Sequence, residues 1–148
     1  MGFVREIKIS YKNRVTSSNL TKISASSDVA KILFETWDND TIQLHESFKI
    51  ILLNNSNIVK GIYEISSGGI TGTLVDIRII FAVVLKSLSS AIILAHNHPS
   101  GNLKPSDADK RLTSKIKQAS ELLDIKLLDH LIITPSQEYF SFADDGII

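Results

Sequence analysis

The chain has 148 residues, of which 43% are hydrophobic, and this content excludes a disordered chain and suits a folded domain with a core. Lys plus Arg and Asp plus Glu number 16 each, so the formal net charge is zero, and the scattered basic residues give no support to strong non-specific nucleic-acid binding. The absence of Cys excludes disulfides and thiolate metal sites.

No segment has the pattern of a membrane or export signal. The longest strongly apolar run, residues 79–85, is far shorter than a membrane span, and residues 1–8 lack the apolar core of a signal peptide. We expect a cytoplasmic protein without a membrane partner. We also expect one domain over residues 1–148, in which residues 1–25 form a strand and a polar connection.

The first third of the chain predicts a strand and a helix. Ile7, Ile9 and Tyr11 alternate with polar residues, which favours an amphipathic first strand, and a polar connection over residues 16–27 follows. The run 26–28 offers caps for a helix. The apolar residues at helical spacing are Val29, Ala30, Leu33, Phe34 and Trp37.

The middle of the chain predicts a hairpin and a helix. Residues 46–53 and 58–65 are typical of strands, and the turn-rich run 54–57 separates them. Residues 76–88 contain many strand-favouring side chains, yet the length, the acidic start and Lys86 near the end favour a buried helix. Gly68, Gly69 and Gly72 indicate a turn rather than a phosphate cradle, because no P-loop pattern accompanies them.

The last third predicts a strand over 91–95, a helix over 106–123, a strand over 125–134, a turn at 135–137 and a strand over 139–142. The helix over 106–123 is expected to face the core with Ala108, Leu112, Ile116, Ala119 and Leu123. Together the elements predict an α/β fold, with one mixed β-sheet and helices on both of its faces.

A polar stretch between two of these elements carries the strongest functional signal. His96 and His98 are two residues apart at the end of a strand, so both imidazoles face the same side. Ser106 and Asp109 are three apart at the start of a helix and share a face. If the loop folds back, His96, His98 and Asp109 converge.

Two imidazoles and one carboxylate suit zinc and leave a fourth position free for water or substrate. This is the pattern of a catalytic site with one Zn2+ per chain. The same residues also fit an ordinary polar turn followed by a serine cap and an acid, which needs no metal.

The whole string resembles the JAMM metalloprotease signature, His-x-His-Pro, six residues, Ser, two residues, Asp. His96, His98, Pro99, Ser106 and Asp109 match every position. The wording of residues 95–101 and 105–110, together with 128–133, is similar to the RadC branch of that family, historically labelled DNA repair proteins. The resemblance covers residues 46–148 well and the first forty loosely. It implies the MPN or JAMM domain, an α-β-α sandwich similar to cytidine deaminases, although the deaminase motif itself is absent.

The resemblance also implies a zinc metalloprotease or isopeptidase acting on a protein or peptide. Candidates for the general base are Glu35, Glu46, Glu64, Asp76 and Glu121. In the resembled family a Glu precedes an apolar strand well upstream of the histidines, and Glu46 matches that placement, with Glu64 in reserve. Ser106 would donate a hydrogen bond to the oxyanion. His130, mid-strand among apolar residues, is either a satisfied core residue or a support for the metal ligands, and His45 is expected to face away.

Two other functions stay open at this point. One is a metal-dependent nuclease, suggested only by the RadC label and opposed by the neutral charge. The other is a non-catalytic MPN-type binding module. Many RadC proteins carry an N-terminal helix-hairpin-helix region, and the first forty residues here show no such pattern, which weakens a link to DNA. An exposed strand edge leaves a dimer open.

Overall fold

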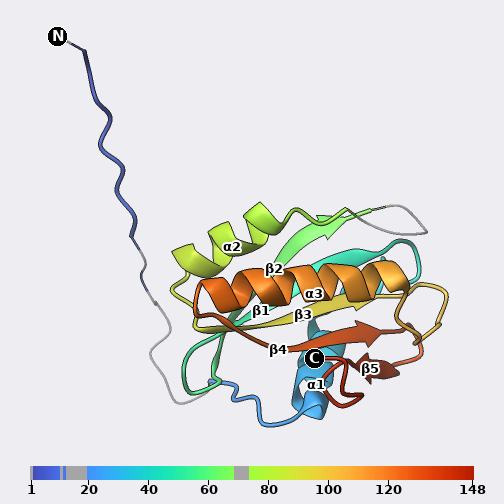
Figure 1. The fold of residues 1–148 in the computed structure, drawn as a ribbon. Helices are drawn as coiled ribbons and strands as arrows, with labels where there is room; N and C mark the ends of the chain where they lie inside the picture. The colour runs from blue at the N-terminus through green and yellow to red at the C-terminus, as the bar shows by residue number, and fades with distance from the viewer. Residues whose placement is uncertain (1, 11, 13–19, 69–73) are drawn as a thin grey trace.

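The computed structural model describes residues 2–10, 12, 20–68 and 74–148 (Figure 1). The elements within these ranges are α1 (Ser26–Thr36), β1 (Ser47–Leu53), β2 (Val59–Ser67), α2 (Ile77–Lys86), β3 (Ala91–Asn97), α3 (Asp107–Leu122), β4 (Lys126–Ile133) and β5 (Tyr139–Ser141). From the first helix onward, this order confirms the predicted succession of helices and strands, including the helical choice for α2.

The strands form one mixed sheet in the order β2-β1-β3-β4-β5. The central strand β3 runs antiparallel to β1, with His96 opposite Phe48, and parallel to β4, with His96 opposite Ile132. Every residue of β3 is buried, as expected for a central strand covered on both faces. The predicted mixed α/β sheet is therefore confirmed.

Helices cover both faces of the sheet, as predicted (Figure 1). On one face α1 packs Leu33 and neighbouring residues against Ile93 and Ala95 of β3. On the other face α2 and α3 pack against Ile92 and Leu94 of the same strand. Since side chains alternate along a strand, His96 lies on the face that carries α2 and α3.

Near the start of each helix a polar side chain accepts hydrogen bonds from backbone N–H groups. Asp28 accepts from the backbone N–H groups of Ser24 and Ala25, so it caps α1 from inside the first turn. Asp76 accepts from the N–H of Arg78 at the start of α2. Ser106 caps α3 in the same way, as the sequence predicted.

Two sequence predictions are wrong. Residues 2–10 form no strand, and Ile7 and Ile9 stay 87% and 77% exposed, because they pair with no strand among the described residues. Ala108 and Leu123 are exposed rather than on the inner face of α3. That face instead includes Thr113 and Ser120, whose hydroxyl groups can be buried because each donates to the carbonyl one turn earlier.

Some predictions fall on residues that the structure does not describe. These are Tyr11, the first four residues (16–19) of the polar connection, and the turn at Gly69 and Gly72. In the described ranges no helix has both the length and the apolar character needed to cross a membrane.

Candidate metal centre

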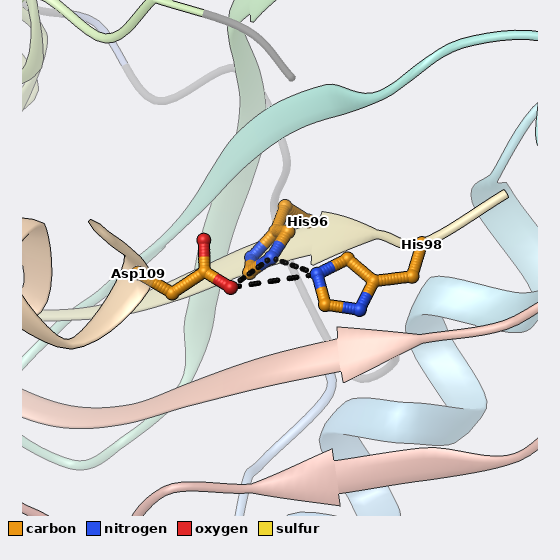
Figure 2. Close-up of side chains that lie close together, drawn as sticks. All are labelled: His96, His98 and Asp109. Atoms are coloured by element: carbon orange, nitrogen blue, oxygen red, sulfur yellow. Dashed lines mark hydrogen bonds and ion pairs between the residues drawn. The ribbon is translucent and has the colours of Figure 1, made fainter. Parts of the chain in front are cut away.

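Two of the predicted ligands come from the end of the central strand. β3 continues two residues beyond the predicted 91–95 to Asn97, so His96 lies within the strand and His98 directly after it. The His96 ring stacks on Phe48, with 6.1 Å between ring centroids. Figure 2 shows that the two imidazoles point toward each other, with 2.9 Å between their Nε2 atoms.

The third predicted ligand comes from the first turn of α3. Asp109 Oδ2 lies 3.5 Å from His96 Nε2 and 3.4 Å from His98 Nε2 (Figure 2). One ligand atom from each of the three residues lies within 4.8 Å of the other two. The structure thus brings together His96, His98 and Asp109, as the sequence predicted.

The three side chains are largely shielded from water, but His98 and Asp109 keep some surface that solvent can reach. Their exposed fractions are 3% for His96, 12% for His98 and 19% for Asp109. Burial raises the pKa of Asp109, but contacts with His96 and His98 outweigh burial and hold this pKa well below its ordinary value. The carboxylate is therefore ionised at neutral pH and available as a ligand.

A tight turn fixes the orientation of His98. Gly101 adopts φ +83°, a conformation that glycine takes without steric cost, and the chain then returns so that the carbonyl of Asn102 lies 2.5 Å from His98 Nδ1. Because a carbonyl only accepts, His98 Nδ1 is the donor. Burial lowers the pKa of His98, yet Asp109 and the Asn102 carbonyl outweigh it and raise this pKa overall.

The geometry of these atoms fits a cation. In neutral His98 the Nε2 atom carries a lone pair, since Nδ1 holds the proton, and this lone pair faces Asp109 Oδ2 and His96 Nε2. Electron-rich atoms this close repel one another unless a positive charge lies among them, and either a proton on His98, whose pKa is raised, or a metal ion supplies that charge. Two imidazole nitrogens and one carboxylate oxygen are the ligand set that open zinc sites use.

Glu46, the predicted general base, lies just before β1 and is half-buried. It precedes Phe48 by two residues, and Phe48 pairs with His96, so Glu46 approaches the face that carries the histidines. Burial is the main cause of the raised pKa of Glu46; His96 and His98 act against it and Asp109 adds to it. Glu46 is therefore close enough to all three ligands for their charges to influence its pKa.

The other acidic candidates lie elsewhere. Glu64 is exposed and pairs with Lys49, whose ammonium group lies over the Trp37 ring on the α1 face. Asp76 caps α2 and pairs with Arg78. Glu35 is on α1, and Glu121 is exposed in the last turn of α3, at the opposite end from Asp109.

Asn97 holds the backbone on both sides of Glu46. Its side-chain amide donates to the carbonyls of Ile42 and His45 at 2.8 and 2.9 Å, and its Oδ1 accepts from the N–H of Ser47 at 2.7 Å. Asn97 is completely buried and faces away from the two neighbouring histidines. It therefore links the strand that carries the ligands to the segment that carries Glu46.

Ser106 lies beside the third ligand. Its Oγ accepts from the N–H of Asp109 at 3.0 Å, while its own N–H donates to Asp109 Oδ2 at 2.9 Å. This reciprocal capping box fixes the carboxylate. Because Ser106 Oγ acts as an acceptor here, its hydroxyl proton is free to donate to another group.

Two residues lie behind His96: His130, which the sequence left as either a core residue or a support, and Thr113, which the sequence argument missed. His130 is 2.7 Å from His96 Nδ1 through its Nε2 atom, and 2.7 Å from Thr113 Oγ1 through its Nδ1 atom. Complete burial holds the pKa of His130 well below its ordinary value, and His96 contributes in the same direction. Thr113 was detectable in principle, because it follows Asp109 by four residues and so shares its helix face.

Comparison with known proteins gives a consistent result. The family model described as a RadC-like JAB domain matches residues 23–147. A protein of Flavobacterium johnsoniae is 54% identical over 103 residues, covering 70% of this chain and 44% of that protein. One from Porphyromonas gingivalis is 45% identical over 103 residues, covering 70% and 45%. One from Alkaliphilus metalliredigens is 40% identical over 141 residues, covering 95% and 58%.

All three relatives carry the name UPF0758 protein, which states no activity. The chain spans about half the length of these curated relatives. The family match covers most of the chain, includes every residue of the site, and agrees with the mixed sheet and its covering helices. The chain belongs to the RadC-like JAB domain family.

Proposed function

We propose that the protein is a zinc-dependent hydrolase that cleaves an amide bond, as a peptidase or isopeptidase, in a protein or peptide substrate. The observation that carries this proposal is the convergence of His96, His98 and Asp109, with Glu46 just before the strand that pairs with the histidine strand and on the same face of the sheet. Family membership supports a metal-dependent hydrolase in general terms.

His96 and His98, through Nε2, and Asp109, through Oδ2, would hold the zinc ion. Three protein ligands leave a position for water, and bound zinc lowers the pKa of that water and polarises the substrate carbonyl. The Ser106 N–H bond to Asp109 Oδ2 and the Asn102 carbonyl at His98 Nδ1 orient two of the ligands.

Glu46 acts as the general base and then as the general acid. Its carboxylate accepts a proton from the attacking water and passes the same proton to the nitrogen of the leaving amine, so that the C–N bond breaks as a carboxylic acid and an amine form. The raised pKa of Glu46 suits this exchange. A carboxyl group with a higher pKa holds the proton taken from water more firmly, and it can then donate that proton to the amine at a pH nearer neutrality.

Ser106 stabilises the negative charge that develops on the carbonyl oxygen. Its Oγ is occupied as an acceptor by the N–H of Asp109, and the hydroxyl proton remains for the oxyanion. A donor of this kind is commonly worth about 3 kcal/mol in the transition state.

The test is a hydrolysis screen of zinc-loaded protein against pooled, internally quenched peptides and isopeptide-linked peptides. We expect the wild type to cleave at least one pool, a chelator to stop the reaction, and zinc to restore it. Glu46→Gln should lower the rate by a factor of about 100 or more while retaining zinc, because only the proton-transfer group is lost.

The matched control is Glu64→Gln, an exposed glutamate paired with Lys49 on the neighbouring strand. This variant should keep the wild-type rate. Equal rates for Glu46→Gln and wild type would contradict the role of Glu46. Failure of fully zinc-loaded wild type to cleave any pool would contradict the hydrolase and favour a binding module.

A further inference from the structure

The position of one proton follows from the contacts of Thr113 in α3. Its Oγ1 lies 2.7 Å from the carbonyl oxygen of Asp109 and 2.7 Å from Nδ1 of His130. A carbonyl oxygen only accepts, so the single hydroxyl proton of Thr113 goes to Asp109. Thr113 Oγ1 must then accept the other bond, and the proton in that bond belongs to His130 Nδ1.

The protonation of the other His130 nitrogen follows from this. His130 lies in β4 with no exposed surface, stacked on Phe142 at 4.5 Å between ring centroids, and its two ring nitrogens contact only Thr113 and His96 among the described hydrogen bonds. An imidazole buried in this way without a carboxylate partner is neutral and carries one N–H. Since Nδ1 holds that proton, Nε2 accepts one from His96 Nδ1 at 2.7 Å.

The consequence concerns the atom of His96 that faces the site. With its proton on Nδ1, neutral His96 presents a lone pair on Nε2, the atom 3.5 Å from Asp109 Oδ2 and 2.9 Å from His98 Nε2. We propose that Thr113 and His130 are positioning residues that fix His96 in the tautomer whose Nε2 is free to bind a metal. This inference deepens the proposed function and rests on it for its biological role.

The chain of bonds also links two ligands that are on different elements. It begins at the backbone carbonyl of Asp109 in α3, passes through Thr113 and His130, and ends at His96 in β3. These hydrogen bonds restrict the rotation of the His96 ring in the metal-free protein. The ligand is therefore oriented before a metal ion binds.

The experiment uses two pairs of variants. Thr113→Val removes the hydroxyl at nearly constant volume, and its matched control is Thr36→Val, which removes the same hydroxyl-to-carbonyl bond in the exposed last turn of α1. His130→Phe keeps a ring for stacking on Phe142 but offers no acceptor. His130→Gln restores an acceptor close to the position of Nε2.

The first readout is the tautomer itself, measured by long-range proton–nitrogen correlation spectra of the histidine rings in metal-free protein at mildly alkaline pH. In wild type we expect the proton of both His96 and His130 on Nδ1. Thr113→Val should produce a population with the His96 proton on Nε2, because His130 no longer has an acceptor at Nδ1, and Thr36→Val should match wild type.

The second readout is the dissociation constant for Co2+, followed by its visible absorption. His130→Phe should weaken binding by about 10 to 100-fold and Thr113→Val by about 10-fold, the range known for groups that orient metal ligands. His130→Gln should recover much of the loss, and Thr36→Val should bind as wild type does.

Several outcomes overturn the inference. A wild-type His96 with its proton on Nε2 does so, and so do unchanged tautomers and Co2+ affinity in Thr113→Val. If His130→Phe fails to fold, the wild-type and Thr113→Val spectra decide. If wild type binds no metal, the proposed function fails, and the tautomer measurement still decides this inference. If wild type binds metal but His96 carries its proton on Nε2 in the metal-free protein, this inference fails and the proposed function stands.

Discussion

Asp129 is a buried carboxyl group that joins the C-terminal segment to β4. It is 6% exposed and accepts hydrogen bonds from the N–H of His130 at 2.7 Å, from Ser141 Oγ at 2.6 Å and from the N–H of Ala143 at 3.0 Å. Burial raises the pKa of Asp129, and these three bonds only partly oppose the rise. The native state therefore holds a proton on Asp129 more readily than the unfolded chain does.

This difference predicts a pH dependence of stability. As pH rises from the ordinary carboxyl pKa through the raised native pKa, the native state binds more protons than the unfolded state, so the contribution of Asp129 to the free energy of unfolding falls. Asp129→Asn cannot ionise, and its oxygen still accepts from the two N–H groups.

The measurement is urea unfolding of wild type and Asp129→Asn at several pH values from about 4 to 7. We expect the stability of wild type relative to the variant to decline with rising pH. A difference that is constant, or that grows with pH, would contradict the raised pKa.

At the scale of residues, spacing alone indicated which side chains share a face but left a metal site and an ordinary capped turn both open, and the family resemblance favoured the metal site. His96 and His98 alternate along a strand, and Ser106 and Asp109 share a helix face, so both pairs are visible as local patterns. Glu46 was placed only through family resemblance, because its proximity depends on how β1 pairs with β3. The His130–Thr113 contact spans two elements, and no local pattern predicts it.

At the scale of elements, Asn97 is the link between the ligand strand and the segment that carries Glu46. Asn97→Ala removes three hydrogen bonds, two of them buried and one partly buried, and leaves the carbonyls of Ile42 and His45 without these partners. We expect a loss of about 2–3 kcal/mol in the free energy of unfolding, at about 1 kcal/mol for each bond. Denaturant unfolding of wild type and Asn97→Ala measures this difference in the free energy of unfolding.

The matched control for this prediction is Asn55→Ala, in the exposed turn between β1 and β2. A surface substitution of this kind should change stability by no more than about 0.5 kcal/mol. If Asn97→Ala is equally mild, the segment before β1 is held by other contacts.

Local sequence signals predicted the elements well where these elements contact the sheet. The helix α2 was identified from its length and end charges despite strand-favouring residues, and it buries Ile80, Phe81 and Val84. The strand predicted from Ile7 and Ile9 does not form, because alternation specifies two faces but does not supply a neighbouring strand to bond with.

At the scale of the whole molecule, the sheet order brings the site together. β3 lies at the centre, so that β1 delivers Glu46 from one side, β4 delivers His130 from the other, and the connection from β3 to β4 passes through α3 and Asp109. The sequence predicted a mixed sheet but not its strand order, because pairing between distant strands leaves no local signal. The site is therefore a product of topology as much as of the motif.

The central claim is that His96, His98 and Asp109 form a metal site, and the metal content of the purified protein tests it most directly. Elemental analysis after zinc loading and removal of excess should give about one zinc per wild-type chain. His96→Ala and Asp109→Ala should lose it, and His45→Ala, whose backbone carbonyl rather than its ring contacts Asn97, should keep it. Wild type without zinc, or zinc retained in both ligand variants, would contradict the account.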